Sequence, residues 1–199
     1  VGMPRSGSTL IETILDLNPN VVGLGECNYL KKSYLEWNSS GNKEISFYEY
    51  YLKKRNLNTS INGITTDKNL YNFMFIGLIA QSFPKAKIIY CYRNPMDNLL
   101  SLYKANFSQG NYFSSSIEDS TKLLIRQKEI IQESKSMYKN IIYSINYDDL
   151  VFHPEKELKS LTSWLGWDWS EEYLYPENNE RAVATASNVQ IRSPINTNS

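Results

Sequence analysis

The stretch that decides the fold is Val1-Gly2-Met3-Pro4-Arg5-Ser6-Gly7-Ser8-Thr9, and a helical pattern of apolar residues follows it. Its two glycines and its final hydroxyl residue have the spacing of a phosphate-binding loop that opens a helix. Ser8 stands where that loop carries its lysine, which disfavours ordinary ATP or GTP hydrolysis. The backbone N–H groups of the helix start can still bind an anion, and Arg5 adds positive charge inside the loop. The alternative is a plain Gly/Ser helix start.

Strand patterns alternate with helical patterns along the rest of the chain. We expect helices at residues 9–17, 73–83, 96–106, 117–139 and 154–165, and strands at residues 63–66, 87–92 and 141–147. This alternation predicts the α/β class: a P-loop-like three-layer fold with a mostly parallel central sheet flanked by helices. Residues 29–57 form a polar, Tyr-rich helical excursion beside that core.

Three polar clusters fall at the carboxyl ends of expected strands, where α/β folds bind their ligands. They are residues 4–9, called here the phosphate-type loop, Asp67-Lys68 and Arg93-Asn94. Arg93 is followed by Pro95, which suits the first turn of a helix, and Ser101 lies about two turns into that helix. Arg93 and Ser101 are therefore placed to bind one anion together. Pairing of Arg93 with Asp97 is the alternative.

Composition excludes several classes of protein. The 199 residues suggest one domain with a substantial core. The chain has 21 Lys plus Arg and 21 Asp plus Glu, hence zero net charge, which argues against a general nucleic-acid partner. Two cysteines and one histidine exclude a four-Cys or His-rich zinc site, so we expect no metal. The longest apolar run, residues 73–80, is too short to form a transmembrane segment.

Several motifs, in order, resemble those of the sulfotransferases that use PAPS (3′-phosphoadenosine 5′-phosphosulfate). The loop at residues 4–9 resembles the family's 5′-phosphosulfate loop, and residues 92–103 resemble its 3′-phosphate motif. Tyr147-Asp148-Asp149-Leu150-Val151 and the segment at residues 186–194 resemble two later motifs. The resemblance covers nearly the whole chain and is nearest to tyrosylprotein sulfotransferases and bacterial sulfotransferases with tetratricopeptide repeats.

The resemblance implies transfer of a sulfuryl group from PAPS, as co-substrate, to an acceptor hydroxyl of a tyrosine, a saccharide or a small alcohol. In-line geometry and electrostatic positioning then supply most of the catalysis, without a metal. Residues 1–199 would be a single sulfotransferase domain of a longer chain, with a truncated first strand, in a bacterial cytoplasm. The sequence identifies neither the acceptor, nor the oligomeric state, nor the role of residues 29–57.

The resemblance also assigns catalytic roles. Glu26 would be the base that accepts the acceptor's proton, and Lys68 the cation on the leaving phosphate. Arg5 would assist at the phosphosulfate, and Ser187 would contact the bridging region. A solvated loop carboxylate and an ordinary surface lysine are the alternatives for Glu26 and Lys68.

Nucleotide binding would involve both phosphate motifs and two later residues. The expected binding residues are Pro4, Arg5, Ser6, Gly7, Ser8, Thr9, Arg93, Ser101, Tyr147 and Arg192. For Tyr147, a core position at a strand end is an equal alternative. Two other functions stay open on the sequence: a P-loop-type kinase or NTPase, and a non-catalytic nucleotide-binding module.

Overall fold

The structure is a computed structural model that describes residues 1–41, 44–56, 63–105, 107, 110–179 and 195. Its strands form two parallel pairs. One joins β1 (Val21–Gly23) to β2 (Ile64–Thr66), and the other joins β3 (Ile88–Tyr92) to β4 (Ile142–Asn146). Gly2 also pairs in parallel with Cys91 of β3, so the chain runs beside β3 just before the phosphate-type loop.

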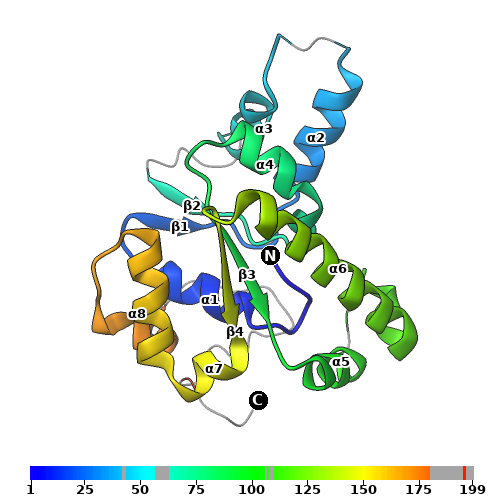
Figure 1. The fold of residues 1–199 in the computed structure, drawn as a ribbon. Coiled ribbons are helices and arrows are strands. Elements are labelled where there is room, and N and C mark those ends of the chain that lie inside the picture. The colour runs from blue at the N-terminus through cyan, green and yellow to red at the C-terminus, as the bar shows by residue number, and fades with distance from the viewer. Residues whose placement is uncertain (42–43, 57–62, 106, 108–109, 180–194, 196–199) are drawn as a thin grey trace.

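Helices surround these strands in chain order. They are α1 (Ser8–Leu15), α2 (Tyr29–Ser39), α3 (Phe47–Asn56), α4 (Ile76–Ser82), α5 (Pro95–Lys104), α6 (Ile117–Tyr138), α7 (Tyr147–Phe152) and α8 (Pro154–Leu165), with short 3-10 turns η1 (Leu70–Phe75), η2 (Tyr112–Ser115), η3 (Glu171–Leu174) and η4 (Pro176–Asn178). Figure 1 shows α1 and α8 on one side of β3 and β4, α6 on the other, and α2 and α3 projecting away from both. No helix among the described residues is long and apolar enough to cross a membrane.

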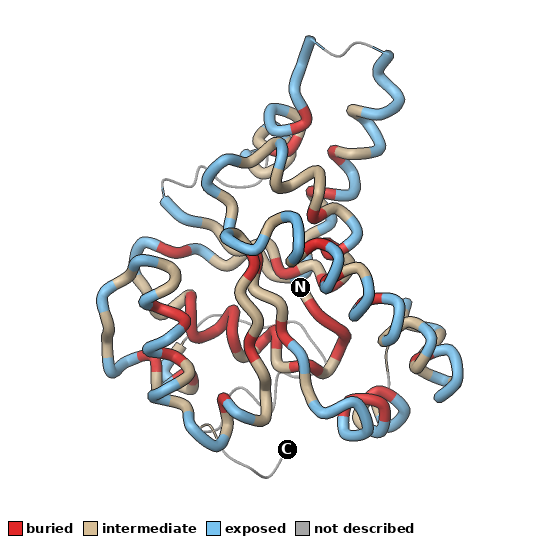
Figure 2. Tube along the Cα trace, viewed as in Figure 1, coloured by how far each residue is buried: buried red, intermediate tan, exposed pale blue. Residues whose placement is uncertain are grey.

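The two faces of the β3–β4 pair bury different residues, as alternation along a strand requires. Cys91 and Ile145 pack with α1 and α8 in one cluster. Ile88 and Ile142 pack with Phe73, Ile76 and Ile131 in another. Figure 2 shows this buried interior as red segments on the strands and on α1. The prediction of an α/β fold with parallel strands between helices is confirmed, although the described strands pair as two small sheets.

Helix α7 was not expected from the sequence. The predicted strand at residues 141–147 ends at Asn146, whose side chain accepts a hydrogen bond from the N–H of Asp148 and so caps a new helix. Asn is a favoured N-cap residue. This early turn places Tyr147 at the start of a helix, beside the phosphate-type loop.

Candidate active site

The loop at residues 4–9 turns tightly into α1 through two left-handed residues. Arg5 has φ 66° and Gly7, the N-cap of α1, has φ 88°. A Cβ atom on Gly7 would lie 2.4 Å from Cδ2 of Tyr147, so the aromatic ring packs directly on the glycine backbone. Only glycine satisfies both conditions. The turn at Gly7 begins α1 directly after the loop, and the N–H groups of a helix N-terminus are the usual donors of an anion site.

Replacing Gly7 with Ala should both strain the loop and displace Tyr147. The left-handed backbone costs an L-residue about 1–2 kcal/mol. Gly166 provides a matched control, because its φ is 78° and a Cβ there would meet nothing within 4 Å. Thermal unfolding should show both variants destabilised, whereas titration with 3′-phosphoadenosine 5′-phosphate (PAP) should show weaker binding only for Gly7→Ala. Equal PAP affinity in the two variants would contradict this account of the loop.

The loop is joined to α5, so the two predicted phosphate motifs meet. Arg5 donates from Nε to Oγ of Ser101 over 3.1 Å. Asn98, which the sequence analysis did not single out, donates from Nδ2 to the carbonyl of Pro4 over 2.9 Å and is buried. Oγ of Ser6 is buried and has no hydrogen-bond partner in the part of the chain that the structure describes. A buried polar atom of this kind in an anion-type loop is a candidate ligand contact.

Arg93 lies near the same loop, close enough for its charge to act on Arg5. Its Nε lies 3.4 Å from Oδ1 of Asp148, and its guanidinium carbon is 4.8 Å from the ring centroid of Tyr147. Asp148 is therefore an acidic partner of Arg93, where the alternative drawn from the sequence was Asp97. Burial lowers the pKa of Arg5, and the nearby charge of Arg93 acts in the same direction. The positive charges of Arg5 and Arg93 repel each other, and an anion bound near both would offset this repulsion.

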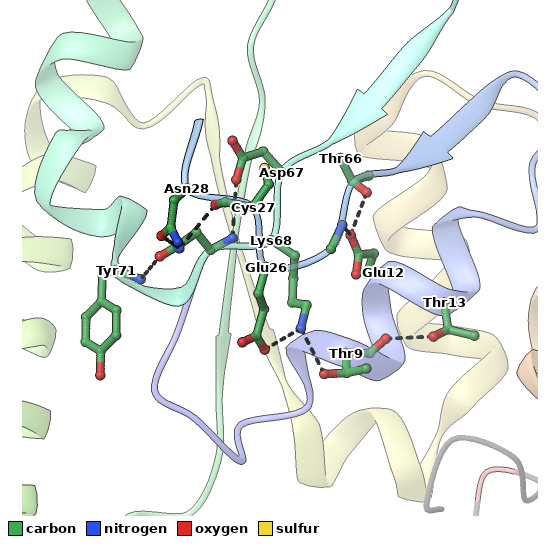
Figure 3. Close-up of polar contacts among 12 residues, drawn as sticks. Thr9, Glu12, Thr13, Glu26, Cys27, Asn28, Thr66, Asp67, Lys68 and Tyr71 are labelled. Carbon is green, nitrogen blue, oxygen red and sulfur yellow. Dashed lines mark hydrogen bonds and ion pairs between the residues drawn. The ribbon is translucent and has the colours of Figure 1, made fainter. Parts of the chain in front are cut away.

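Glu26 and Lys68 lie together, because β1 and β2 run parallel and end side by side. Beyond the strands the ladder continues, with Leu24 N–H donating to Thr66 and Lys68 N–H donating to Gly25. The Nζ of Lys68 donates to Oε1 of Glu26 over 2.7 Å and to Oγ1 of Thr9 over 3.2 Å (Figure 3). The side chain of Lys68 is 6% exposed and that of Glu26 is 46% exposed.

The contact with Thr9 connects this ion pair to the phosphate-type loop, because Thr9 is the second residue of α1. A buried ammonium, a half-exposed carboxylate and a helix N-terminus thus converge. This set can neutralise an anion and accept a proton from a group arriving from solvent.

A half-buried carboxylate, Asp67, fixes the backbone before Lys68 through several hydrogen bonds. It accepts hydrogen bonds from Asn72 Nδ2 at 2.9 Å, from Tyr51 OH at 3.2 Å and from Asn69 N–H at 3.3 Å. Burial raises the pKa of Asp67. The sequence placed Asp67 beside Lys68 but gave no sign that Tyr51, on α3, would reach it.

Cys27 follows Glu26 and should be nearly inert to alkylation. Burial, followed by the charge of Asp67, raises the pKa of its thiol to about 12 from an ordinary value of 9.0. At pH 8 its thiolate fraction, and hence its rate with iodoacetamide, should be about 10³-fold below that of an unperturbed thiol. Peptide mass spectrometry over time would measure this rate. Labelling as fast as in the denatured chain would contradict the burial of this segment.

The described residues bring most predicted site residues into two adjoining groups. Arg5, Ser101, Arg93 and Tyr147 surround the loop, while Glu26 and Lys68 meet Thr9. Ser187 and Arg192 lie outside the described residues. Of the residues that were missed, Asn98 and Asp148 join segments far apart in the sequence, which local patterns do not reveal.

Comparison with known proteins adds independent findings. A family model described as "Sulfotransferase family" matches residues 44–171. An uncharacterized protein of Aquifex aeolicus is 29% identical over 98% of this chain and 28% of its own length. Protein-tyrosine sulfotransferase 1 of Danio rerio is 22% identical over 88% of this chain and 54% of its own. The chain thus spans about a quarter to a half of the length of these two relatives.

Solved structures show a similar fold. The sulfotransferase domain from the curacin biosynthetic pathway superposes with a TM-score of 0.70 at 16% identity, over 95% of this chain and 83% of that one. Mouse sulfotransferase SULT7A1 complexed with PAP gives a TM-score of 0.54 at 14% identity, over 99% of this chain and 75% of that one. At 14–16% sequence identity, these superpositions show a shared fold and no more.

Proposed function

Because the chain belongs to the sulfotransferase family, we propose that it transfers a sulfuryl group from PAPS to an acceptor hydroxyl. The observation that carries the proposal is the Glu26–Lys68 ion pair, held against Thr9 at the start of the phosphate-loop helix. A relative named as a protein-tyrosine sulfotransferase and a fold neighbour complexed with PAP support it.

The residues at the loop fit an anionic nucleotide. The first turn of α1 offers backbone N–H groups, and Arg5 and Arg93 supply positive charge at the loop. Ser6 adds a buried hydroxyl that has no hydrogen-bond partner among the described residues. Ser101 holds Arg5, and Tyr147 packs between Gly7 and Arg93. When bound, PAPS supplies the sulfuryl group and the phosphate oxygen that it leaves.

Lys68 and Glu26 would divide the chemistry between them. The ammonium of Lys68 is buried and adjoins the helix that begins at the loop, so it can stabilise negative charge that develops on a leaving phosphate oxygen. The half-exposed carboxylate of Glu26 can accept the proton of an acceptor hydroxyl. Ser187 and Arg192 remain predicted contacts of the co-substrate.

The acceptor would approach Glu26 from the side of α2 and η1. Asn28, two residues after Glu26, is the N-cap of α2. Tyr71 of η1 is close enough for the charge of Glu26 to raise the pKa of its hydroxyl, in addition to the larger effect of burial. Tyrosine, saccharide and small-alcohol acceptors are all compatible with this surrounding.

Thermal unfolding with PAP, compared with ATP and Mg²⁺, tests the nucleotide part of the proposal. A ligand at about 100 times its Kd stabilises the native state by roughly 2.7 kcal/mol. PAP should raise the unfolding temperature of the wild-type protein, and it should do so much less for Arg93→Ala. A rise with ATP and Mg²⁺ alone would contradict the assignment and favour a kinase.

A further inference from the structure

Two carboxylates, Glu12 of α1 and Asp16 at its C-cap, hold the end of β1 and the segment that follows it. Oδ1 of Asp16 accepts the N–H of Gly23 at 2.7 Å, and Oε1 of Glu12 accepts the N–H of Gly25 at 2.9 Å. Four residues of helix rise about 6.0 Å and two residues of strand about 6.6 Å, so the two spacings match. The N–H of Leu24, which lies between them, donates instead to Thr66 across the β1–β2 ladder.

Oε1 of Glu12 accepts a second hydrogen bond, from Oγ1 of Thr66 at 3.1 Å (Figure 3). One carboxylate oxygen therefore joins the ends of both β1 and β2. Gly25 immediately precedes Glu26, and Thr66 comes two residues before Lys68. Gly25 is fixed on its other side as well, since its carbonyl accepts the N–H of Lys68 at 3.0 Å.

The position of Glu12 is costly for a carboxylate. The residue is 5% exposed, and a buried charge is unfavourable unless hydrogen bonds compensate it. An apolar residue would pack at lower cost but would leave the Gly25 N–H and the Thr66 hydroxyl without this acceptor. Glu12 also lies one helical turn after Thr9, which contacts Lys68 directly.

We propose that Glu12 is a positioning residue, which sets Glu26 and Lys68 in register with the phosphate loop. The inference rests on the proposed function and extends it. Glu12 acts through its hydrogen bonds to Gly25 and Thr66. Asp16 uses the same chemistry one turn farther from the site, where it anchors Gly23 of β1 and, through Oδ2, Asn179.

The matched pair Glu12→Ala and Asp16→Ala separates positioning from stability. Glu12→Ala removes a buried acceptor from α1 and Asp16→Ala a half-buried one from its C-cap, so both should lower the unfolding temperature. Misplacement of catalytic groups by about 1 Å can cost roughly 10²-fold in rate. We expect a loss of that order in kcat, measured as PAP released from PAPS, for Glu12→Ala alone. The Kd for PAP, measured by calorimetry, should stay within a few-fold of wild type in both variants.

A second readout needs neither nucleotide nor acceptor. The rate at which acetic anhydride labels Lys68, followed by peptide mass spectrometry, reports how tightly its ammonium is held. Glu12→Ala should label faster than wild type at Lys68, and Asp16→Ala should not. Glu12→Gln keeps an oxygen that can accept both hydrogen bonds, so its kcat should lie between those of wild type and Glu12→Ala.

The outcomes are distinguishable. Equal losses of kcat in the two alanine variants, or unchanged Lys68 labelling in Glu12→Ala, would overturn the positioning role. If wild-type protein neither binds PAP nor consumes PAPS, the proposed function fails, and the labelling comparison alone decides the role of Glu12.

If Glu12→Ala does not unfold cooperatively, Glu12→Gln is compared with Asp16→Asn. A lower kcat or faster Lys68 labelling in Glu12→Gln alone supports the proposal, and equal values overturn it.

Discussion

Replacing Glu26 with Gln should lower kcat by about 10²–10⁴-fold, the range by which a positioned general base accelerates proton transfer. The amide has the shape of the carboxylate, and its oxygen can still accept the hydrogen bond from Lys68, so the site should keep its geometry. It has no basic oxygen that can take the acceptor's proton. PAP affinity, measured by calorimetry, should therefore change little while turnover of PAPS collapses.

The chain offers a matched control on its surface. Glu118 and Lys122 of α6 form an ion pair at 2.7 Å, the same separation as Glu26 and Lys68, but both side chains are exposed. Glu118→Gln should leave kcat and PAP affinity unchanged. Wild-type turnover in Glu26→Gln would remove Glu26 from the mechanism.

Lys68→Met should lower kcat by about 10²–10³-fold, as expected when one preorganised donor to a developing negative charge is lost. Methionine has a similar length and is at home in a buried site, so the main change is the loss of the ammonium. The partner carboxylate of Glu26 is half exposed and can be solvated by water, which limits the cost to stability. Single-turnover kinetics with PAPS would measure the chemical step directly.

Lys122→Met provides the corresponding control and should have full activity. The loss of kcat in Lys68→Met should also be greater for acceptors with which breaking the bond between sulfur and the leaving phosphate oxygen limits the rate most. A fall in PAP affinity that accounts for the whole effect, with kcat unchanged, would instead make Lys68 a binding residue.

The fold was largely predictable because its signals are local. Apolar runs gave β3 and β4 to within two residues at either end, and Pro154 with inward Leu158 and Leu161 gave α8. Helix α7 was missed because six residues are too few to show a helical period, and its signals were limited to the capping Asn146 and two aspartates in its first turn. In the segment predicted as the first helix, Leu10, Ile14 and Leu17 share one apolar face, yet Leu10 and Leu17 are only partly buried. There the buried positions include polar residues that serve the site.

The candidate site was only partly predictable. The loop and the ends of the strands are sequence features, and their convergence follows from parallel topology. The pairing of Arg93 with Asp148 and the burial of Glu12 depend on contacts between distant segments. The local pattern offered Asp97, four positions away, as the alternative to phosphate binding by Arg93. The tertiary arrangement is what brings Asp148 to Arg93.

The central claim is that this chain carries out sulfuryl transfer from PAPS. Its most direct test is incubation of the wild-type protein with PAPS and a panel of tyrosine peptides, saccharides and small alcohols, followed by mass spectrometry of the acceptors and quantification of PAP. The account predicts a sulfated acceptor and an equal amount of PAP, both greatly reduced in Glu26→Gln. A wild-type protein that binds PAP but yields no sulfated product with any acceptor would contradict it and favour a nucleotide-binding module.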